Sequence, residues 1–164
     1  MLKRFNLEFA KHANTPMSST LKLSNDEKGK KVDNKLFGSM IGSLFYFTTS
    51  RPNLCFSVGV CARFQSHPTE LHLKAVKRIM KYVTGTSDFG LWFSYDFNPT
   101  LVGFSDVDWA GYLDDRKSTF GGCFFLGNNL ITGYSKKQNL ISLSPAEVEY
   151  IDAGSCCTQV LYFA

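Results

Sequence analysis

The stretch that most constrains the fold is Leu101–Trp109, which reads LVGFSDVDW. Apolar and polar residues alternate along it, which is typical of a β-strand. Because side chains alternate across a strand, Asp106 and Asp108 are expected to point to the same side. Two acids at the end of an apolar row either hold a divalent cation or are solvated in the following turn. The spacing alone leaves both interpretations open.

Three further segments have the composition of strands. Gly121–Leu126 and Leu130–Lys136 are joined by a Gly-Asn-Asn turn signal at 127–129, so they are expected to form an antiparallel hairpin. Leu91–Tyr95 also has the composition of a strand. The acidic strand and the hairpin therefore predict three consecutive antiparallel strands.

A helix is predicted after the hairpin. Ser144, Pro145 and Glu147 have the spacing of a capping box, in which Glu147 is expected to reach back to the Ser144 amide. Glu149 would then be left to approach the strand that bears Asp106, and carboxylate oxygens suit Mg²⁺. Periodicity predicts that the buried stripe of this helix consists of Ala146, Tyr150, Ala153, Cys157 and Leu161.

The first half of the chain has a different pattern. Residues 1–35 are polar and turn-rich, which predicts an extended, solvated lead-in outside any core. Helical spacing follows at 35–50, 53–65 and 70–83, with Thr69 as the cap of the third helix. A helical block followed by a small antiparallel sheet with one helix across it is an α+β arrangement.

The third predicted helix has a basic face. Lys74, Lys77, Arg78 and Lys81 follow the i, i+3, i+4, i+7 rule. Such a stripe either follows the phosphates of a nucleic acid or is a solvated face, and the pattern does not choose between them. With 18 basic and 14 acidic residues, the net charge of +4 is compatible with a polyanionic partner.

Cysteine usage and hydropathy indicate the compartment. The five cysteines form no CxxC pair, so free thiols in a reducing compartment are expected. The sequence shows no signal peptide and no long apolar run, which predicts a soluble intracellular protein with no membrane partner. Cytoplasmic and nuclear locations are not distinguished.

Several motifs occur in one order along the chain, and together they resemble a known family. The second half is similar to the ribonuclease H region of copia-type LTR retrotransposon Pol polyproteins, through Phe104–Gly111, Asp115–Thr119, Ser135–Gln138 and Ser144–Tyr150. The first half is similar to the tail and connection of the reverse transcriptase in the same polyproteins, through Thr15–Met17, Ser39–Tyr46, Ser50–Pro52 and His72–Ile79.

The resemblance implies a ribonuclease H-like fold that cleaves the RNA strand of an RNA–DNA hybrid with two Mg²⁺ ions. Asp106 matches the family's first-strand aspartate and Glu149 its first-helix glutamate, so both are expected to be catalytic metal ligands. Lys136 and Lys137 would lie where a strand meets the hybrid backbone. No small-molecule substrate is implied. The division expected is a lead-in at 1–35, a connection-like segment at 36–97 and a truncated ribonuclease H-like domain at 98–164.

The sequence departs from the family pattern in ways that affect the expected activity. Asp152 stands where a small residue is usual, near the helix face that should pack on the sheet. The family's later catalytic aspartates lie on segments that this sequence lacks, so negligible cleavage by the isolated chain is expected. Tyr112–Asp115 matches the Tyr-x-Asp-Asp signature of polymerases, but its polar flanks predict a loop instead. The alternatives are a non-catalytic nucleic-acid-binding module and a fragment with no selected function.

Overall fold

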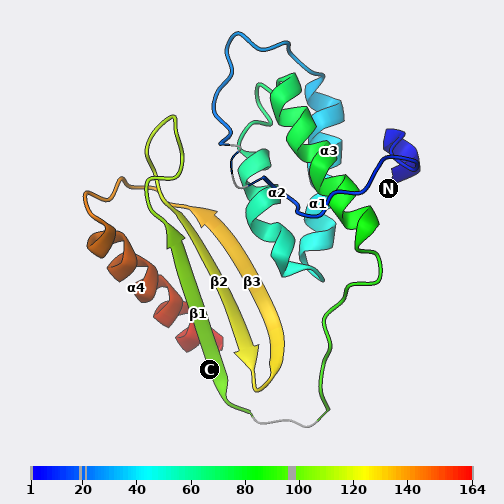
Figure 1. Cartoon of the computed structure of the whole chain (residues 1–164). Helices are drawn as coiled ribbons and strands as arrows, with labels where there is room; N and C mark the ends of the chain where they lie inside the picture. The colour runs from blue at the N-terminus through cyan, green and yellow to red at the C-terminus, as the bar shows by residue number, and fades with distance from the viewer. Residues whose placement is uncertain (1, 19, 21, 96–98, 164) are drawn as a thin grey trace. The chain divides into compact units, whose positions relative to one another are not determined.

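A computed structural model describes residues 2–18, 20, 22–95 and 99–163 of the chain. The chain divides into two compact units, residues 1–90 and residues 91–164, and each has its own core (Figure 1). We call them the helical unit and the sheet unit. The expected domain boundary between 97 and 98 lies outside the described residues, and the three-part division stays a prediction.

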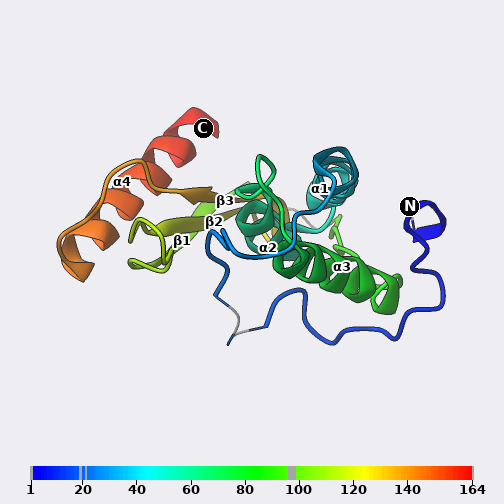
Figure 2. The same ribbon diagram turned by 90° about the horizontal axis from the view of Figure 1, so that it is seen from above.

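In the described part of the helical unit, three α-helices pack on one another (Figure 2). They are α1 (Asn34–Thr48), α2 (Cys55–Ala62) and α3 (Glu70–Gly85), and a 3-10 turn at Pro52–Leu54 leads into α2. A second 3-10 turn lies at Leu2–Phe5. The helical unit thus has its helices where the sequence predicts them. Its fully buried apolar side chains include Phe37, Met40, Ile41, Leu44, Leu54, Val58, Val76, Ile79 and Met80.

The start of α3 is held by the predicted cap. Thr69 is the N-cap, and its backbone N–H donates to Nδ1 of His72 over 3.0 Å. The other ring nitrogen of His72 lies 2.9 Å from the carbonyl oxygen of Ser24. A carbonyl only accepts, so the proton of this imidazole is on Nε2. The buried His72 ring also stacks on Phe64 at 4.0 Å between centroids.

The lead-in differs from its prediction in one respect. Leu7 and Leu23 are buried, so this segment contributes to the core of the helical unit and is not solvated throughout. An isolated bridge between Lys31 and Thr69 also ties the lead-in to the start of α3. Single leucines in a polar segment show no periodicity, which is why the sequence pattern does not reveal their burial.

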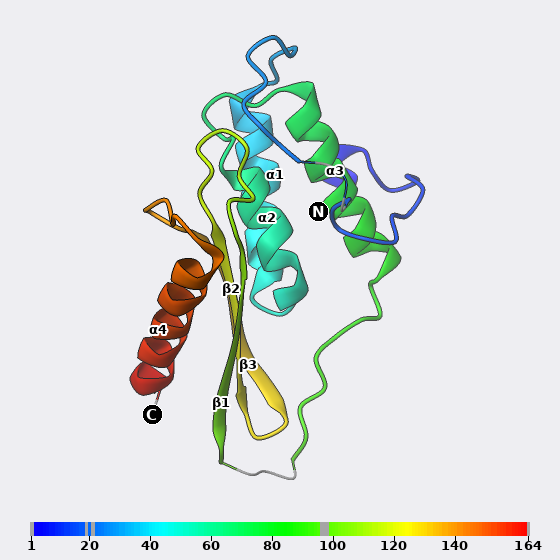
Figure 3. The same cartoon turned by 60° about the vertical axis from the view of Figure 1, so that its left-hand side comes forward.

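The sheet unit has the predicted α+β arrangement. Three antiparallel strands, β1 (Leu101–Asp108), β2 (Thr119–Leu126) and β3 (Asn129–Lys137), lie in the order β1-β2-β3. The helix α4 (Pro145–Phe163) lies against one face of this sheet (Figure 3). Tyr112–Asp115 lies in the loop between β1 and β2, as its polar flanks predict.

Leu91–Tyr95 is not a strand, so that prediction was wrong. The backbone of Ser94 is held by a side chain instead of a neighbouring strand. Its N–H donates to Oδ1 of Asn129 over 2.7 Å, and its carbonyl accepts from Nδ2 of the same amide over 3.1 Å. One amide side chain therefore satisfies both backbone groups that a ladder would have used.

The predicted buried stripe of α4 was also wrong. Tyr150 is 84% exposed, Leu161 is exposed as well, and the buried residues are Val148, Asp152 and Cys156. Apolar side chains occur on all sides of this helix, so periodicity does not select one face. The sheet selects it, because Gly103 on β1 has no side chain and α4 approaches closely there. A methyl group on Gly103 would lie 2.9 Å from each of three atoms, on Cys156, Phe124 and Val160.

None of the helices in the described part of the chain is both long enough and apolar enough to cross a membrane.

Candidate functional site

The two predicted catalytic acids lie on the elements expected of them. Asp106 is near the end of β1, paired with Gly121 of β2, and its side chain is exposed. Glu149 is in the first half of α4 and is also exposed. Strand alternation directs Asp106 to the face opposite that of Ser105.

The cap of α4 uses Glu147, as predicted, but with a different partner. The backbone N–H of Glu147 donates to Oγ of Ser144 over 3.1 Å. The carboxylate of Glu147 accepts from the backbone N–H of Leu143 over 2.7 Å, one residue before the amide that was expected. Its negative charge at the helix N-terminus is favourable. Glu149 therefore stays outside the cap.

Asp152 occupies the centre of the interface between α4 and the sheet. Its side chain is only 1% exposed, and it accepts a hydrogen bond from Ser105. Its Oδ1 atom has no hydrogen-bond partner among the described residues. An ionised carboxylate with an unpaired oxygen is costly to bury, because water no longer solvates the charge.

The pKa of Asp152 depends on the charges of the two predicted catalytic acids, Asp106 and Glu149. Burial raises the pKa of Asp152 above its usual value, while the Ser105 hydrogen bond opposes the rise. The negative charges of Glu149 and Asp106 raise this pKa further. Asp106 and Glu149 are therefore close enough to influence one buried carboxyl.

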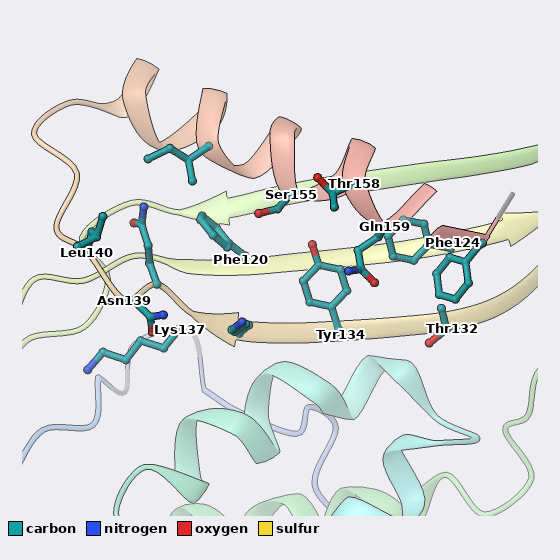
Figure 4. A pocket seen from close by; sticks show the side chains of 14 residues that line it. Phe120, Phe124, Thr132, Tyr134, Lys137, Asn139, Leu140, Ser155, Thr158 and Gln159 are labelled. Atoms are coloured by element: carbon teal, nitrogen blue, oxygen red, sulfur yellow. The ribbon is translucent and has the colours of Figure 1, made fainter. Parts of the chain in front are cut away.

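Tyr134 presents a second buried oxygen to the same interface. Ser105, Gly122 and Tyr134 lie side by side across the three strands. The Tyr134 ring covers Gly122, where a methyl group would overlap Cε1 of the ring. Figure 4 shows its hydroxyl pointing toward α4. This hydroxyl is buried and has no hydrogen-bond partner among the described residues. Burial raises the pKa of Tyr134, and the charge of Asp152 adds to the rise.

A pocket of about 590 Å³ lies between β3 and α4 (Figure 4). Phe120 and Phe124 supply apolar surface, and Ser155, Thr158 and Gln159 supply polar groups from the helix. The residues that line this pocket do not include Asp106 or Glu149. The pocket and the two predicted acids are therefore separate features of the sheet unit.

The described residues do not fit a magnesium centre as they stand. Among them, no group of three or more His, Cys, Asp or Glu side chains is arranged to hold a metal ion. Asp106 and Glu149 would supply hard oxygen ligands, but two such ligands are only part of a two-metal site.

The predicted basic residues of the helical unit lie together on α3. Lys74 is exposed, while Lys77, Arg78 and Lys81 are half-buried. None of the four lies within 4.0 Å of a described carboxylate. The basic face of α3 is therefore uncompensated by acids in the part of the chain that the structure describes.

The two predicted basic residues of the sheet unit differ in their exposure and in their contacts. Lys136 is exposed on β3. Lys137 forms an ion pair with Asp115 at 2.7 Å and lies 3.5 Å from the centroid of the Tyr112 ring. Burial would raise the pKa of Asp115, but the Lys137 hydrogen bond and charge, with the backbone N–H of Lys117, lower it. Lys137 thus already has an intramolecular partner.

Sequence reasoning missed four residues at these places. Ser105 and Tyr134 become visible only when strand alternation is combined with the hairpin register, which places both beneath α4. Lys11 and His12 line a groove with α3, yet they fall in the segment interpreted as solvated.

The chain resembles several known proteins over most of its length. It is 38% identical over 150 residues to the "Retrovirus-related Pol polyprotein from transposon RE1" of Arabidopsis thaliana, which covers 92% of this chain and 10% of that protein. It is also 38% identical over 161 residues to the corresponding Pol polyprotein from transposon TNT 1-94 of Nicotiana tabacum, covering 93% of this chain and 12% of that protein. A shorter relative is the "Secreted RxLR effector protein 161" of Plasmopara viticola, with 40% identity over 69% of this chain and 80% of that protein.

The chain is homologous to retrotransposon Pol polyproteins. Homology to copia-type Pol polyproteins is what the ordered motifs predicted, and it extends over about nine-tenths of the chain. The chain spans only about a tenth of the length of the Pol polyproteins it matches. No protein-family model matches the chain. No solved structure matches it significantly.

Proposed function

We propose that this Pol segment joins the end of the reverse transcriptase to the first half of the ribonuclease H domain. Three observations support the proposal: the motif order, the succession of a helical unit and a sheet unit, and the positions of two acids. Asp106 on β1 and Glu149 on α4 lie on the elements where the resemblance expects its first two catalytic carboxylates.

The activity that best fits the geometry of this chain is nucleic-acid binding. The observation behind it is the uncompensated basic face of α3, formed by Lys74, Lys77, Arg78 and Lys81. Like charges three and four residues apart on a helix repel one another. A phosphate backbone would relieve that repulsion and release condensed counterions. In the sheet unit, Lys136 is exposed and would contact phosphate by itself, whereas Lys137 would do so only by sharing its charge with Asp115.

Binding is tested by fluorescence anisotropy with a labelled RNA–DNA hybrid over a potassium chloride series. The affinity should fall steeply with salt, and Lys77→Gln should reduce the logarithmic salt slope by about one. Lys22→Gln is the matched control, because Lys22 is an exposed lysine of the same unit outside the basic face. Absent or salt-insensitive binding would overturn the proposal.

Cleavage of the RNA strand is an activity distinct from nucleic-acid binding. The parent activity of the proposed region is Mg²⁺-dependent cleavage of RNA in hybrids, and we propose that the isolated chain does not perform it. Asp106 and Glu149 offer only part of the ligand set, and Asp152 is buried with a raised pKa. Incubation of the same hybrid with the chain and Mg²⁺ should leave the RNA intact. Hybrid-specific cleavage that disappears in Asp106→Asn would show that the site is functional.

Magnesium binding can be measured without any activity. Calorimetry with MgCl₂ on the unmodified chain, Asp106→Asn and Glu149→Gln should detect no specific binding in any of the three. Binding to the unmodified chain that is lost in both variants would show that these two acids share an ion.

A further inference from the structure

A groove of about 570 Å³ lies between the lead-in and α3 in the helical unit. Its walls come from segments at least 60 residues apart in the sequence. One wall is the basic face of α3, and the other is the stretch from Lys11 to Asn14. In Figures 1 and 2 the first part of the chain runs beside α3.

Two contacts hold the lead-in in this position. Nε of Arg78 donates to the carbonyl oxygen of Thr15 over 3.2 Å, and a terminal nitrogen of Arg78 donates to the Thr15 hydroxyl over 2.9 Å. At the end of α3, His12 packs against Gly85, where a methyl group would lie 2.8 Å from Cβ of His12. A side chain at Gly85 would therefore displace His12.

The charged side chains that line the groove are all basic. Its lining includes five basic side chains, from Lys11, Lys74, Lys77, Arg78 and Lys81, and no acidic one. Lys3, Lys30 and Lys137 elsewhere in the chain have carboxylate partners, whereas these five have none among the described residues. A concave surface lined by one sign of charge concentrates counter-ions, so the natural occupant is an anion.

The length of the charged row favours an extended anion. Lys74 and Lys81 are seven residues apart, which corresponds to about 10 Å along a helix. Along the axis of a duplex, each strand advances about 3.4 Å per phosphate, so the row is long enough to meet more than one phosphate of the same strand. A single inorganic phosphate would meet only part of the row.

We propose that this groove binds the phosphodiester backbone of one nucleic-acid strand, with Lys11 and His12 of the lead-in as its second wall. The inference rests on the proposed nucleic-acid-binding function for the α3 face. In this proposal the lead-in is part of the binding site. The site therefore requires the contacts at Thr15 and Gly85 that hold the lead-in against α3. Asn14 offers an uncharged amide donor at the same wall.

The first test reverses a charge on the lead-in. Anisotropy titrations use labelled oligothymidylate and, in parallel, a labelled RNA strand of the same length. Lys11→Glu should weaken binding of both strands roughly tenfold at moderate salt and lower the salt slope by about one. Lys22→Glu makes the same charge change in the same lead-in outside the groove, and it should leave the affinity within about twofold. Equal losses in the two variants would overturn the inference.

The second test leaves every charge in place. Gly85→Ala should displace His12 and weaken strand binding several-fold, although alanine favours the helix. Gly42→Ala on α1 is the matched control, because a methyl group there meets nothing within 4 Å. Unchanged helical circular dichroism would show that both variants fold. Unchanged affinity of the Gly85→Ala variant would show that the docked lead-in is not part of the binding site.

A competition experiment distinguishes binding of a nucleic-acid strand from binding of inorganic phosphate ions. Inorganic phosphate added at constant ionic strength should not displace the bound strand. Displacement at low phosphate concentration would mean that the groove takes single phosphate ions, and would overturn the strand assignment.

The outcomes also separate this inference from the proposed function. Loss of affinity in Lys77→Gln, with none in Lys11→Glu or Gly85→Ala, would refute the role of the lead-in and keep nucleic-acid binding on α3. Absence of binding by the unmodified chain would refute both.

Discussion

The two units of this chain differ in what they bury. In the helical unit, the fully buried side chains are almost all apolar and come from all three helices. In the sheet unit, few large apolar side chains are as buried as Phe124, and several polar ones are inside, namely Ser118, Thr119, Gln138, Ser142 and Asp152. The helical unit is thus held mainly by apolar packing, and the sheet unit depends more on polar groups.

The difference extends to the surface of the sheet. Large apolar side chains of β1 and β3 remain exposed, among them Val102, Phe104 and Ile131. A thin core with buried carboxyl and hydroxyl groups should respond to pH and to small changes in backbone spacing. A core of interlocking helices should respond most to lost volume.

The largest effect is expected from a cavity in the helical core. Phe37 is fully buried on α1, so Phe37→Ala should lower the free energy of unfolding by about 3–5 kcal/mol. Urea denaturation followed by helical circular dichroism measures it. Leu36→Ala is the control, because Leu36 is 42% exposed, and it should cost less than about 1 kcal/mol. Similar costs for the two would contradict the burial of Phe37 in the helical core.

A smaller effect is expected from a methyl group between β1 and α4. Gly103→Ala should destabilise the sheet unit by about 1–3 kcal/mol, because the new atom meets Cys156, Phe124 and Val160 at once. Both tryptophans, Trp92 and Trp109, belong to this unit, so their fluorescence follows its unfolding.

The matched control for that change is Gly121→Ala on β2. The nearest atoms to a methyl group at Gly121 are 3.8 Å away, an ordinary contact distance. It should leave the stability nearly unchanged. Equal losses at Gly103 and Gly121 would contradict the close approach of α4.

The buried carboxyl of Asp152 should make the sheet unit less stable as pH rises. The pKa of Asp152 is raised in the folded state, so folding favours the protonated form. This contribution is fully present below the usual value of 3.8 and is lost as pH increases through the raised folded value. Asp152→Asn should therefore stabilise the chain by about 1 kcal/mol at neutral pH and flatten this dependence.

Fluorescence-detected denaturation from acidic to neutral pH measures that effect. Glu27→Gln removes the same charge from an exposed position in the helical unit and should leave the profile unchanged. A neutral-pH loss of stability in Asp152→Asn would show that the ionised carboxylate is satisfied in the folded chain.

The smallest effect is expected at the ion pair of Asp115 and Lys137. Asp115 is more than one-third exposed, so solvent screening limits the pair to about 0–1 kcal/mol. The pKa of Asp115 is lowered in the folded state, so this contribution exists above its usual value and is lost as pH falls through the folded value. A double-mutant cycle with Asp115→Asn and Lys137→Gln gives the coupling. A coupling above 2 kcal/mol would contradict the screening.

The local chemistry of the sequence predicted the elements of both units. Thr69 and Ser144 cap helices because their hydroxyls accept from the nearby backbone N–H groups that begin each helix. The alternation of Leu101–Asp108 and the turn at 127–129 specify the strands, since both depend on neighbours within a few residues. Motif order likewise predicted the homology to copia-type Pol polyproteins, which the relatives confirm.

Tertiary packing decided what local chemistry leaves open. Which side of α4 is buried depends on the missing side chain of Gly103, because an evenly apolar helix has no preferred face of its own. The burial of Asp152 beside Ser105 and near Tyr134 follows from that choice. The groove of Lys11 and α3 exists because Arg78 and Gly85 hold a distant segment in place. Sequence thus determined the helices, the three strands of the sheet and the homology to Pol polyproteins. Contacts between distant residues determined the faces and the groove, because only the folded chain brings those residues together.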